Sequence, residues 1–346
     1  MLKVAVVGVG AMGRNHARIF AEMPQTHLAA VADVDAEAAA QVARTYKAEA
    51  YADFEKMLTV ERPDVVSVAV PTQFHRPVAV AALEAGSHVF VEKPLALSVT
   101  DGQAILDAVH RTGRKLAVGH IERFNPAVVE LKRLLDEGQL GRMFQLRSRR
   151  VGPFPPRVED VGVVFDLATH EVNILEYLTK ARVTSLYAET AREIHAAHED
   201  LLSGVLKFSN GAVGVLDINW LTPKKFRELT IIGERGMFAV NYLTQELQFF
   251  ENSSASNGQW EGLTALMGVS EGRVVKYELK RKEPLRAEFE SFVSAVIENH
   301  PPLIDGAEGL RAVLLAEKIV ESGRTHQIIR LTGRLSHALH PSLIHI

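Results

Sequence analysis

Apolar and polar positions follow two different rhythms along the chain. In the first rhythm, short β-branched runs alternate with segments of helical spacing. The runs cover residues 3–8, 27–33, 64–70, 88–93 and 115–120, and the helical segments cover residues 11–23, 35–46, 53–60, 77–86 and 98–113. Strands that are apolar on both faces and alternate with helices are typical of a parallel sheet covered on each side. This rhythm predicts a doubly wound α/β domain at residues 1–122.

The second rhythm begins after a predicted helix at residues 125–141. Strand-like runs follow at residues 143–151, 184–194, 201–210, 212–221, 226–234 and 237–243. Short connections with turn residues at 209–211 and 234–236 favour antiparallel hairpins. We therefore expect an α+β domain with a large, mainly antiparallel open sheet at residues 123–330, followed by a tail at 331–346. Two later helices, around 284–299 and 306–322, could pack on either domain.

The composition is that of a globular protein with a sizeable core. Lys and Arg number 39 against 42 Asp and Glu, which gives a net charge of −3, and 47% of residues are hydrophobic. This balance argues against a nucleic-acid-binding protein, which would carry a basic face. The absence of cysteine excludes disulfides and zinc–thiolate sites. No run approaches the roughly 20 apolar residues of a membrane span, so we expect a cytoplasmic protein.

A glycine-rich loop directly follows the first predicted strand and opens a predicted helix. Its residues are Gly8, Gly10, Ala11, Met12 and Gly13, in the spacing GxGxxG. The first glycine permits a tight turn, the second lets the backbone approach a pyrophosphate, and the third permits close packing of helix on strand. With the strand before it and the helix after it, the loop predicts a Rossmann-type dinucleotide site.

The second predicted strand ends at Asp33, at the spacing where a carboxylate accepts hydrogen bonds from the adenine ribose hydroxyls. A 2′-phosphate would be repelled there, which favours NAD over NADP. Arg14 and nearby basic residues keep NADP open as the alternative.

Ligands of such sheets lie at the carboxyl ends of the strands, so the other strand ends belong to the same candidate site. We expect further cofactor contacts from Pro71, Thr72, His75, Glu92 and Lys93. The plain alternative is that Glu92 and Lys93 only mark the emergence of a buried strand into solvent. If the nicotinamide lies at this strand end, Lys93 is next to the reacting atoms.

Asp166 and His170 lie four residues apart in a segment whose apolar spacing predicts a helix, so both project from one face. Histidine titrates near neutral pH and suits a general base, while the cationic Lys93 can stabilise alkoxide character. Whether Lys93 or His170 takes the proton stays open. The alternative is a helix N-cap followed by a buried histidine, and no third ligand supports a metal site.

The chain resembles the glucose-fructose oxidoreductase, inositol dehydrogenase and MocA (Gfo/Idh/MocA) family. Four motifs in order carry this resemblance: the glycine loop, the strand end Val70–Thr72, the triplet Glu92–Pro94 and the segment Asp166–His170. The resemblance covers nearly the whole chain. It implies an NAD-dependent dehydrogenase acting on CH–OH groups, with Lys93, Asp166 and His170 as the catalytic set. It also implies a homodimer or homotetramer built on the second sheet.

Two segments carry a narrower resemblance, residues 119–126 (GHIERFNP) and 220–230 (WLTPKKFRELT). They are similar to the branch that oxidises C3 of UDP-N-acetylglucosamine or its uronate. The implied substrate-binding residues, besides the catalytic set of Lys93, Asp166 and His170, are Arg123, Asn125, Trp220, Lys224 and Arg227. Cations suit a diphosphate, although the same residues would also suit the exposed side of a strand, and Asn125 would suit a helix N-cap.

Two other functions share parts of this pattern. An inositol or free-sugar dehydrogenase would keep the glycine loop and the catalytic set but ignore the nucleotide. A non-enzymatic NAD-binding sensor would keep the glycines and need none of the catalytic set. His195, His198 and Glu199 have ligand-like spacing, but they lie between predicted strands and are interpreted as a solvated turn.

Overall fold

The computed structural model describes residues 1–155, 158, 160–253 and 271–331. Two compact units divide the chain: Met1–Ile121 with Leu285–Glu317 form the first, and Glu122–Pro284 with the described residues from Lys318 onward form the second. Apart from Leu331, the tail expected at 331–346 lies outside the described residues. Among the helices of the described part, none has the length and apolar character that crossing a membrane requires.

The first unit is built on a parallel sheet of six strands in the order β3-β2-β1-β4-β5-β6. The strands are β1 (Leu2–Val7), β2 (Thr26–Ala32), β3 (Glu49–Tyr51), β4 (Val65–Val68), β5 (His88–Val91) and β6 (Leu116–Val118). The connecting helices are α1 (Ala11–Glu22), α2 (Ala36–Tyr46), α3 (Phe54–Glu61), α4 (His75–Glu84) and α5 (Val99–Thr112), with a short 3₁₀ turn η1 (Thr72–Phe74) before α4. The strand order reverses at β1 and β4, which confirms the predicted doubly wound sheet.

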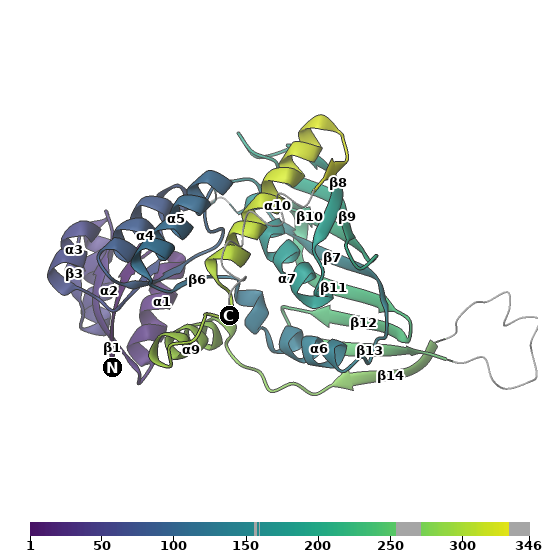
Figure 1. Cartoon of the computed structure of the whole chain (residues 1–346), viewed down its shortest axis with the longest axis horizontal. Helices are drawn as coiled ribbons and strands as arrows, with labels where there is room; N and C mark the ends of the chain where they lie inside the picture. Colours follow the sequence, from purple (N-terminus) through teal and green to yellow (C-terminus); the bar gives the residue numbers. More distant parts are fainter. Residues whose placement is uncertain (156–157, 159, 254–270, 332–346) are drawn as a thin grey trace, which may run out of the picture. The chain divides into compact units, whose positions relative to one another are not determined.

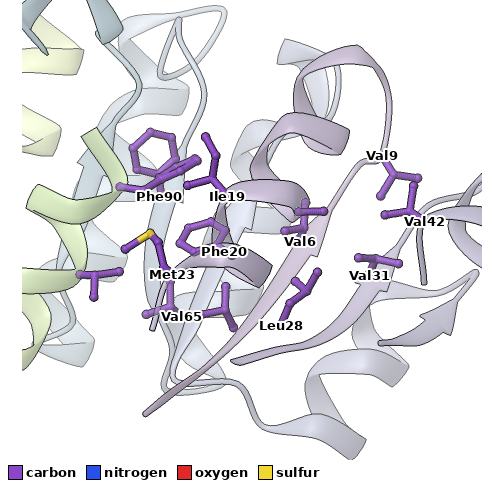
Figure 2. Close-up of a cluster of buried hydrophobic side chains, with 14 of the residues drawn as sticks. Val6, Val9, Ile19, Phe20, Met23, Leu28, Val31, Val42, Val65 and Phe90 are labelled. Atoms are coloured by element: carbon purple, nitrogen blue, oxygen red, sulfur yellow. The ribbon is translucent and has the colours of Figure 1, made fainter. Parts of the chain in front are cut away.

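One face of this sheet is covered by α1 and α2 together with a helix from far along the chain, α9 (Pro284–Ile297). Figure 2 shows Ile19 and Phe20 of α1 in the same cluster as Val65 and Phe90 of the sheet. Phe289 of α9 packs on this cluster, with its ring 4.4 Å from Phe20 and 4.7 Å from Phe90. Burial of such large side chains contributes about 1.5–3 kcal/mol each, so α9 is a structural part of the nucleotide-binding unit.

The second unit contains a sheet of nine strands in the order β14-β13-β12-β11-β7-β10-β9-β8-β15. The strands are β7 (Met143–Pro153), β8 (Val183–Ala191), β9 (Leu201–Phe208), β10 (Val213–Asn219), β11 (Leu221–Gly233), β12 (Gly236–Asn241), β13 (Glu246–Asn252), β14 (Glu271–Tyr277) and β15 (Ile329–Arg330). Only β10 and β7 pair in parallel among the described strands of this sheet. The expected mainly antiparallel sheet is confirmed, including the hairpins at 209–211 and 234–236.

Helices cover one face of this sheet. α6 (Pro126–Asp136) packs on β12 and β13, and α7 (Thr169–Thr179) packs on β7 (Figure 1). The end of α10 (Gly306–Thr325) packs on β8, where the Ser322 hydroxyl accepts a hydrogen bond from the Ala188 amide at 2.9 Å. Strand residues alternate between buried positions toward the helices and partly exposed positions on the other face, for example Leu206 and Val205.

The structure adds four strands that the pattern did not predict, among them the two-residue β15 at one edge of the second sheet. β3 has three residues, all at least partly exposed, at the sheet edge, so it shows no apolar run. β13 and β14 continue the second sheet beyond the last predicted strand. β11 begins at Leu221 and not at Phe226, and between these residues five steps along β11 match two steps along β7. Residues 222–225 therefore form a wide bulge, a feature that often lies beside active sites.

Candidate active site

The three glycines of the loop after β1 have different surroundings. Gly8 has φ +87°, and a Cβ there would lie 2.7 Å from the backbone of Ala69. A Cβ on Gly13 would lie 1.8 Å from the Gly8 carbonyl oxygen. Around Gly10, by contrast, nothing described lies within 4 Å of a Cβ. The protein itself therefore requires the first and third glycines, while the space at Gly10 is open to a ligand.

The helix that follows the loop presents an uncapped N-terminus. Gly10 occupies the N-cap position of α1 without a side-chain hydrogen bond, and no acidic residue lies in the first turn. Ala11 and Met12 are exposed there. Unpaired amides and the positive end of the helix dipole bind anions. The loop therefore fits the pyrophosphate of a dinucleotide.

Asp33 follows β2 and faces the same loop. One carboxylate oxygen accepts a hydrogen bond from the Val9 amide at 2.7 Å, and the other accepts one from the Asp35 amide at 3.0 Å. These bonds fix the carboxylate, and each oxygen keeps a lone pair for a ribose hydroxyl. Arg14, the residue that keeps NADP open as the alternative, is exposed, and its Nε donates to the Val9 carbonyl at 3.1 Å. The arrangement fits an adenine ribose.

At the end of β4, Pro71 is exposed and Thr72 is buried in the 3₁₀ turn η1. His75 begins α4 with only 1% of its surface exposed. Its ring nitrogens lie 2.9 Å from the Pro94 carbonyl oxygen and 3.0 Å from the Val70 carbonyl oxygen. His75 therefore joins the loops that follow β4 and β5. Burial lowers the pKa of His75 more than these two carbonyls raise it.

At the end of β5, Glu92 is buried and Lys93 is half-buried. The Glu92 carboxylate accepts the Lys93 backbone amide at 3.1 Å and bonds to His16 Nε2 at 2.9 Å. Burial acts to raise the pKa of Glu92, but the hydrogen bond and charge of His16 and the charge of Lys93 outweigh it, so this pKa lies below its usual value. Sequence reasoning did not identify His16, because it lies 76 residues from its partner.

In the second unit, Asp166 lies in a π-helical turn, Val164–Ala168, that runs directly into α7, where His170 is buried. The predicted regular helix is thus widened at Asp166, which changes the expected one-turn stacking of the two side chains. Single π turns inside helices are frequent at functional sites. Asp166 is not an N-cap; its amide donates to the Gly162 carbonyl at 3.0 Å.

The loop before β9 supports the start of this π turn. The Val163 amide donates to the Glu199 carbonyl at 2.8 Å, and the Val164 amide donates to the Glu199 side chain at 3.1 Å. His195 is only 7% exposed, and its Nδ1 accepts from the His198 amide at 2.9 Å. The interpretation of this loop as a solvated turn was therefore wrong at His195, because its hydrogen bonds are satisfied inside the fold.

A buried ion network lies beneath α7 and was not predicted from the sequence. Arg150 of β7 is 1% exposed; its guanidinium pairs with Glu171, next to His170, and with Glu122 at 2.6 Å. Glu171 also accepts a hydrogen bond from the Ser148 hydroxyl. Burial acts to raise the pKa of Glu122, but the charge of Arg150 outweighs it, and this pKa lies below its usual value. Arg150 and its two carboxylate partners are far apart in the sequence, so no local sequence pattern predicted these ion pairs.

Two predicted substrate residues, Arg123 and Asn125, are largely engaged with the protein. The Arg123 guanidinium lies 3.5 Å from the ring centre of Tyr177 and Arg123 is 4% exposed. The Asn125 side chain caps α6 by accepting the Ala127 amide at 3.1 Å, and it donates to the Tyr242 carbonyl at 3.0 Å. Both side chains therefore hold the second unit together at this point.

The remaining predicted substrate residues lie at or near the bulge of β11. Trp220 is 3% exposed, and its ring stacks on His195 with 6.1 Å between centres. Lys224 is exposed. The guanidinium of Arg227 lies 3.7 Å from Glu122, and burial, together with the charge of Arg150, lowers the pKa of Arg227. Among the described residues there is no cluster of three or more His, Asp or Glu side chains that could hold a metal ion.

Each unit therefore assembles its own half of the predicted residues. The glycine loop and Asp33 come together in the first unit, and so do the loops after β4 and β5, which include Lys93. Asp166, His170 and Arg227 belong to the second unit, where the charge of Asp166 acts on Arg227.

Comparisons with known proteins give a family match for each of the two units. Residues 2–120 match the oxidoreductase family with an NAD-binding Rossmann fold, and residues 128–239 match the Gfo/Idh/MocA C-terminal domain. UDP-N-acetylglucosamine 3-dehydrogenase of Acidithiobacillus ferrooxidans is 28% identical over 92% of this chain and 96% of its own. A solved structure of that enzyme superposes with a TM-score of 0.82 over 94% of this chain and 98% of its own.

Two other relatives have different substrates in their names. Inositol 2-dehydrogenase of Corynebacterium glutamicum is 31% identical over 63% of this chain and 67% of its own. A levoglucosan dehydrogenase, solved with NADH and levoglucosan, shares the fold at 24% identity with a TM-score of 0.82 over 96% of this chain and 99% of its own. The chain belongs to the Gfo/Idh/MocA oxidoreductase family and is a nicotinamide-dependent dehydrogenase acting on CH–OH groups of the sugar type.

Proposed function

We propose that this enzyme uses NAD to oxidise the C3 hydroxyl of UDP-N-acetylglucosamine or its uronate to the 3-keto sugar. The similarity to the A. ferrooxidans UDP-N-acetylglucosamine 3-dehydrogenase over 92% of the chain carries this proposal. It includes both segments from which the substrate class was expected, residues 119–126 and 220–230. The bulge at 222–225 supports it, since exposed lysines there suit a diphosphate.

NAD is the cofactor that the first unit fits. We assign the pyrophosphate to the open space at Gly10 and the amides of α1, and the adenine ribose to Asp33. NADP remains the alternative, because Arg14 is exposed on the first turn of α1. When bound, the nicotinamide supplies the hydride acceptor. The protein must then remove the hydroxyl proton.

We assign this proton chemistry to Lys93, Asp166 and His170. An ammonium at Lys93 stabilises negative charge that develops on the reacting oxygen, and a neutral imidazole at His170 can accept its proton. Lys93 in its neutral form could accept the proton instead. Asp166 would hold one of these groups or the substrate hydroxyl in position.

The charges near β11 have separate tasks in this proposal. Lys224 and its neighbour Lys225 are exposed on the bulge and would contact the diphosphate. Arg227 is already close to Glu122, so we expect it to contribute less net charge to a ligand than its formal value. Trp220 would act through packing, because it is almost fully buried.

The first test is NADH absorbance when purified protein and NAD meet UDP-N-acetylglucosamine, its uronate, myo-inositol or free sugars. A parallel assay with 2-oxoglutarate would regenerate NAD and reveal turnover if NADH stays tightly held. We expect a signal with the nucleotide sugars only. The double variant Lys224→Ala/Lys225→Ala should raise their KM, while the matched variant Lys280→Ala/Lys282→Ala should leave it unchanged.

A signal with inositol or free sugars only would reject the nucleotide-sugar substrate and leave the proposed catalytic residues in place. This second candidate is favoured by the 31% identity to the inositol 2-dehydrogenase of C. glutamicum.

We also propose that the open face of the nine-stranded sheet forms the interface of a homodimer or homotetramer. Partly exposed apolar side chains gather there, with Val205 47%, Ile232 39% and Val274 47% exposed. A face of this kind is typical of an interaction site. Sedimentation analysis should give a dimer or tetramer for the natural chain and smaller species for Val205→Glu. A monomeric natural chain would reject the proposal.

A further inference from the structure

Three buried side chains form a hydrogen-bonded chain that ends beside Lys93. The Ser67 hydroxyl of β4 lies 2.9 Å from His16 Nδ1, and His16 Nε2 lies 2.9 Å from the Glu92 carboxylate. The second oxygen of that carboxylate accepts the Lys93 amide at 3.1 Å. Three elements of the first unit, α1, β4 and the end of β5, thus meet at one carboxylate.

The surroundings leave this carboxylate little freedom. Ser67 and His16 are 0% exposed. The edge of the His16 ring meets Phe289 of α9 at 4.8 Å between centres. On the other side, a Cβ on Gly119 would lie 3.1 Å from the Glu92 carboxylate. A side chain larger than hydrogen at position 119 would therefore press on Glu92.

The buried carboxylate is a negative charge one residue from the predicted catalytic lysine. Its pKa is held below the usual value by His16 and Lys93, against the effect of burial. The titratable groups that act on it among the described residues are His16, Lys93 and His75, and His75 already contacts the Val70 and Pro94 carbonyls. A fixed anion favours the protonated form of a neighbouring lysine.

We propose that His16 and Ser67 are positioning residues that act through Glu92 to fix the orientation of Lys93 and keep it cationic. This inference rests on the proposed function, in which Lys93 contacts the reacting oxygen. Ser67 orients the His16 ring, His16 holds one carboxylate oxygen, and the other oxygen holds the Lys93 backbone. None of these three side chains needs to touch the substrate.

The test measures the titration of Lys93 directly, without turnover. Competitive labelling of amines with acetic anhydride over a range of pH, read by mass spectrometry of the Lys93 peptide, gives the pKa of its ammonium. Glu92→Gln keeps the size and removes the charge, so we expect the Lys93 amine to react with the anhydride at lower pH than in the natural chain. His16→Leu should act in the same direction, because an unpaired buried carboxyl takes up a proton.

Two variants provide the controls. His16→Gln keeps an amide donor toward Glu92 and should restore most of the shift. His88 lies at the opposite end of β5, where its Nδ1 accepts the Lys115 amide at 2.9 Å. His88→Gln should leave the Lys93 titration unchanged. Circular dichroism and Tm of each variant show whether it is folded, and either Glu92→Gln or His16→Leu alone suffices for the test.

A second readout connects the shift to catalysis. In the folded Glu92→Gln variant, the limb of the kcat profile that belongs to Lys93 should move to lower pH. An unchanged Lys93 titration in both Glu92→Gln and His16→Leu would overturn the inference, even if Lys93 proves essential for turnover. Full turnover in Lys93→Ala would instead overturn the proposed function, whatever the titration shows.

Discussion

The two units carry their predicted functional residues in different ways. In the first unit, the predicted cofactor residues lie at strand ends and in one glycine loop, within short sequence segments that recur in dinucleotide-binding folds. In the second unit, Asp166 and His170 lie on an irregular helix above a buried network of Arg150, Glu171 and Glu122 that joins three separate segments. Backbone amides make up much of a cofactor site, whereas a substrate site depends on side chains from many elements.

Mutations in the two units should have different effects. The glycine loop offers its backbone amides and open space to the cofactor, so a small side chain added there should weaken cofactor binding. The second unit contributes charges that are buried together, so the loss of one member should act first on folding. This difference can be tested by mutation.

Removal of either proposed proton-handling group, one in each unit, should lower turnover strongly. Lys93→Ala and His170→Ala should each lower kcat by about 10²–10⁴-fold, the usual contribution of a positioned acid or base. NAD binding, measured by calorimetry, should stay within a few-fold of the natural enzyme. Full turnover in both variants would reject this catalytic assignment.

Loss of Arg150 should destabilise the second unit strongly. Arg150→Met leaves Glu171 without its paired guanidinium and Glu122 with only the more distant Arg227, and breaking such a buried pair costs about 3–5 kcal/mol. Denaturant unfolding measures this effect. Arg149, the next residue, is half-exposed with Asp217 at 3.5 Å, and Arg149→Met should cost about 0–1 kcal/mol. Equal losses in the two variants would contradict the structural role of the network.

Substitutions of the loop glycines in the first unit should affect NAD binding and folding to different extents. Gly10→Ala meets no described atom, so it should fold normally but weaken NAD binding by about tenfold, or about 1.4 kcal/mol. Gly13→Ala would clash with the Gly8 carbonyl and should lower the Tm as well. Calorimetric titration with NAD and thermal unfolding check both. A Gly10→Ala variant with unchanged NAD affinity would remove the assignment of the pyrophosphate to this space.

A weaker effect is expected on the pH dependence of stability in the second unit. Folding lowers the pKa of Glu122, because Arg150 outweighs burial. Such a carboxyl adds stability above its unfolded pKa of about 4.3, and this stability is lost as the pH falls through the folded value. Glu122→Gln should therefore be less stable than the natural chain at pH 7, with the difference shrinking in acid. A constant difference from pH 7 to pH 3 would contradict this linkage.

The alternation of strands and helices, the glycine loop, and the positions of Asp33 and Lys93 at strand ends could be predicted from the sequence alone. These features are local: each depends on the period of apolar residues or on the conformation of a few consecutive residues. The same reasoning recognised the hairpins at 209–211 and 234–236, which the pairing of β9 with β10 and of β11 with β12 confirms.

The folded structure was needed to identify which polar groups share a buried site. His16 meets Glu92 across 76 residues, Arg150 meets Glu171 across 21 residues, and His75 joins two loops through carbonyl groups. A buried charge is stable only beside its partner, and that partner is selected by the packing of the elements and not by their order in the chain. For the same reason, sequence spacing placed His195 in solvent while the fold buries it against Trp220.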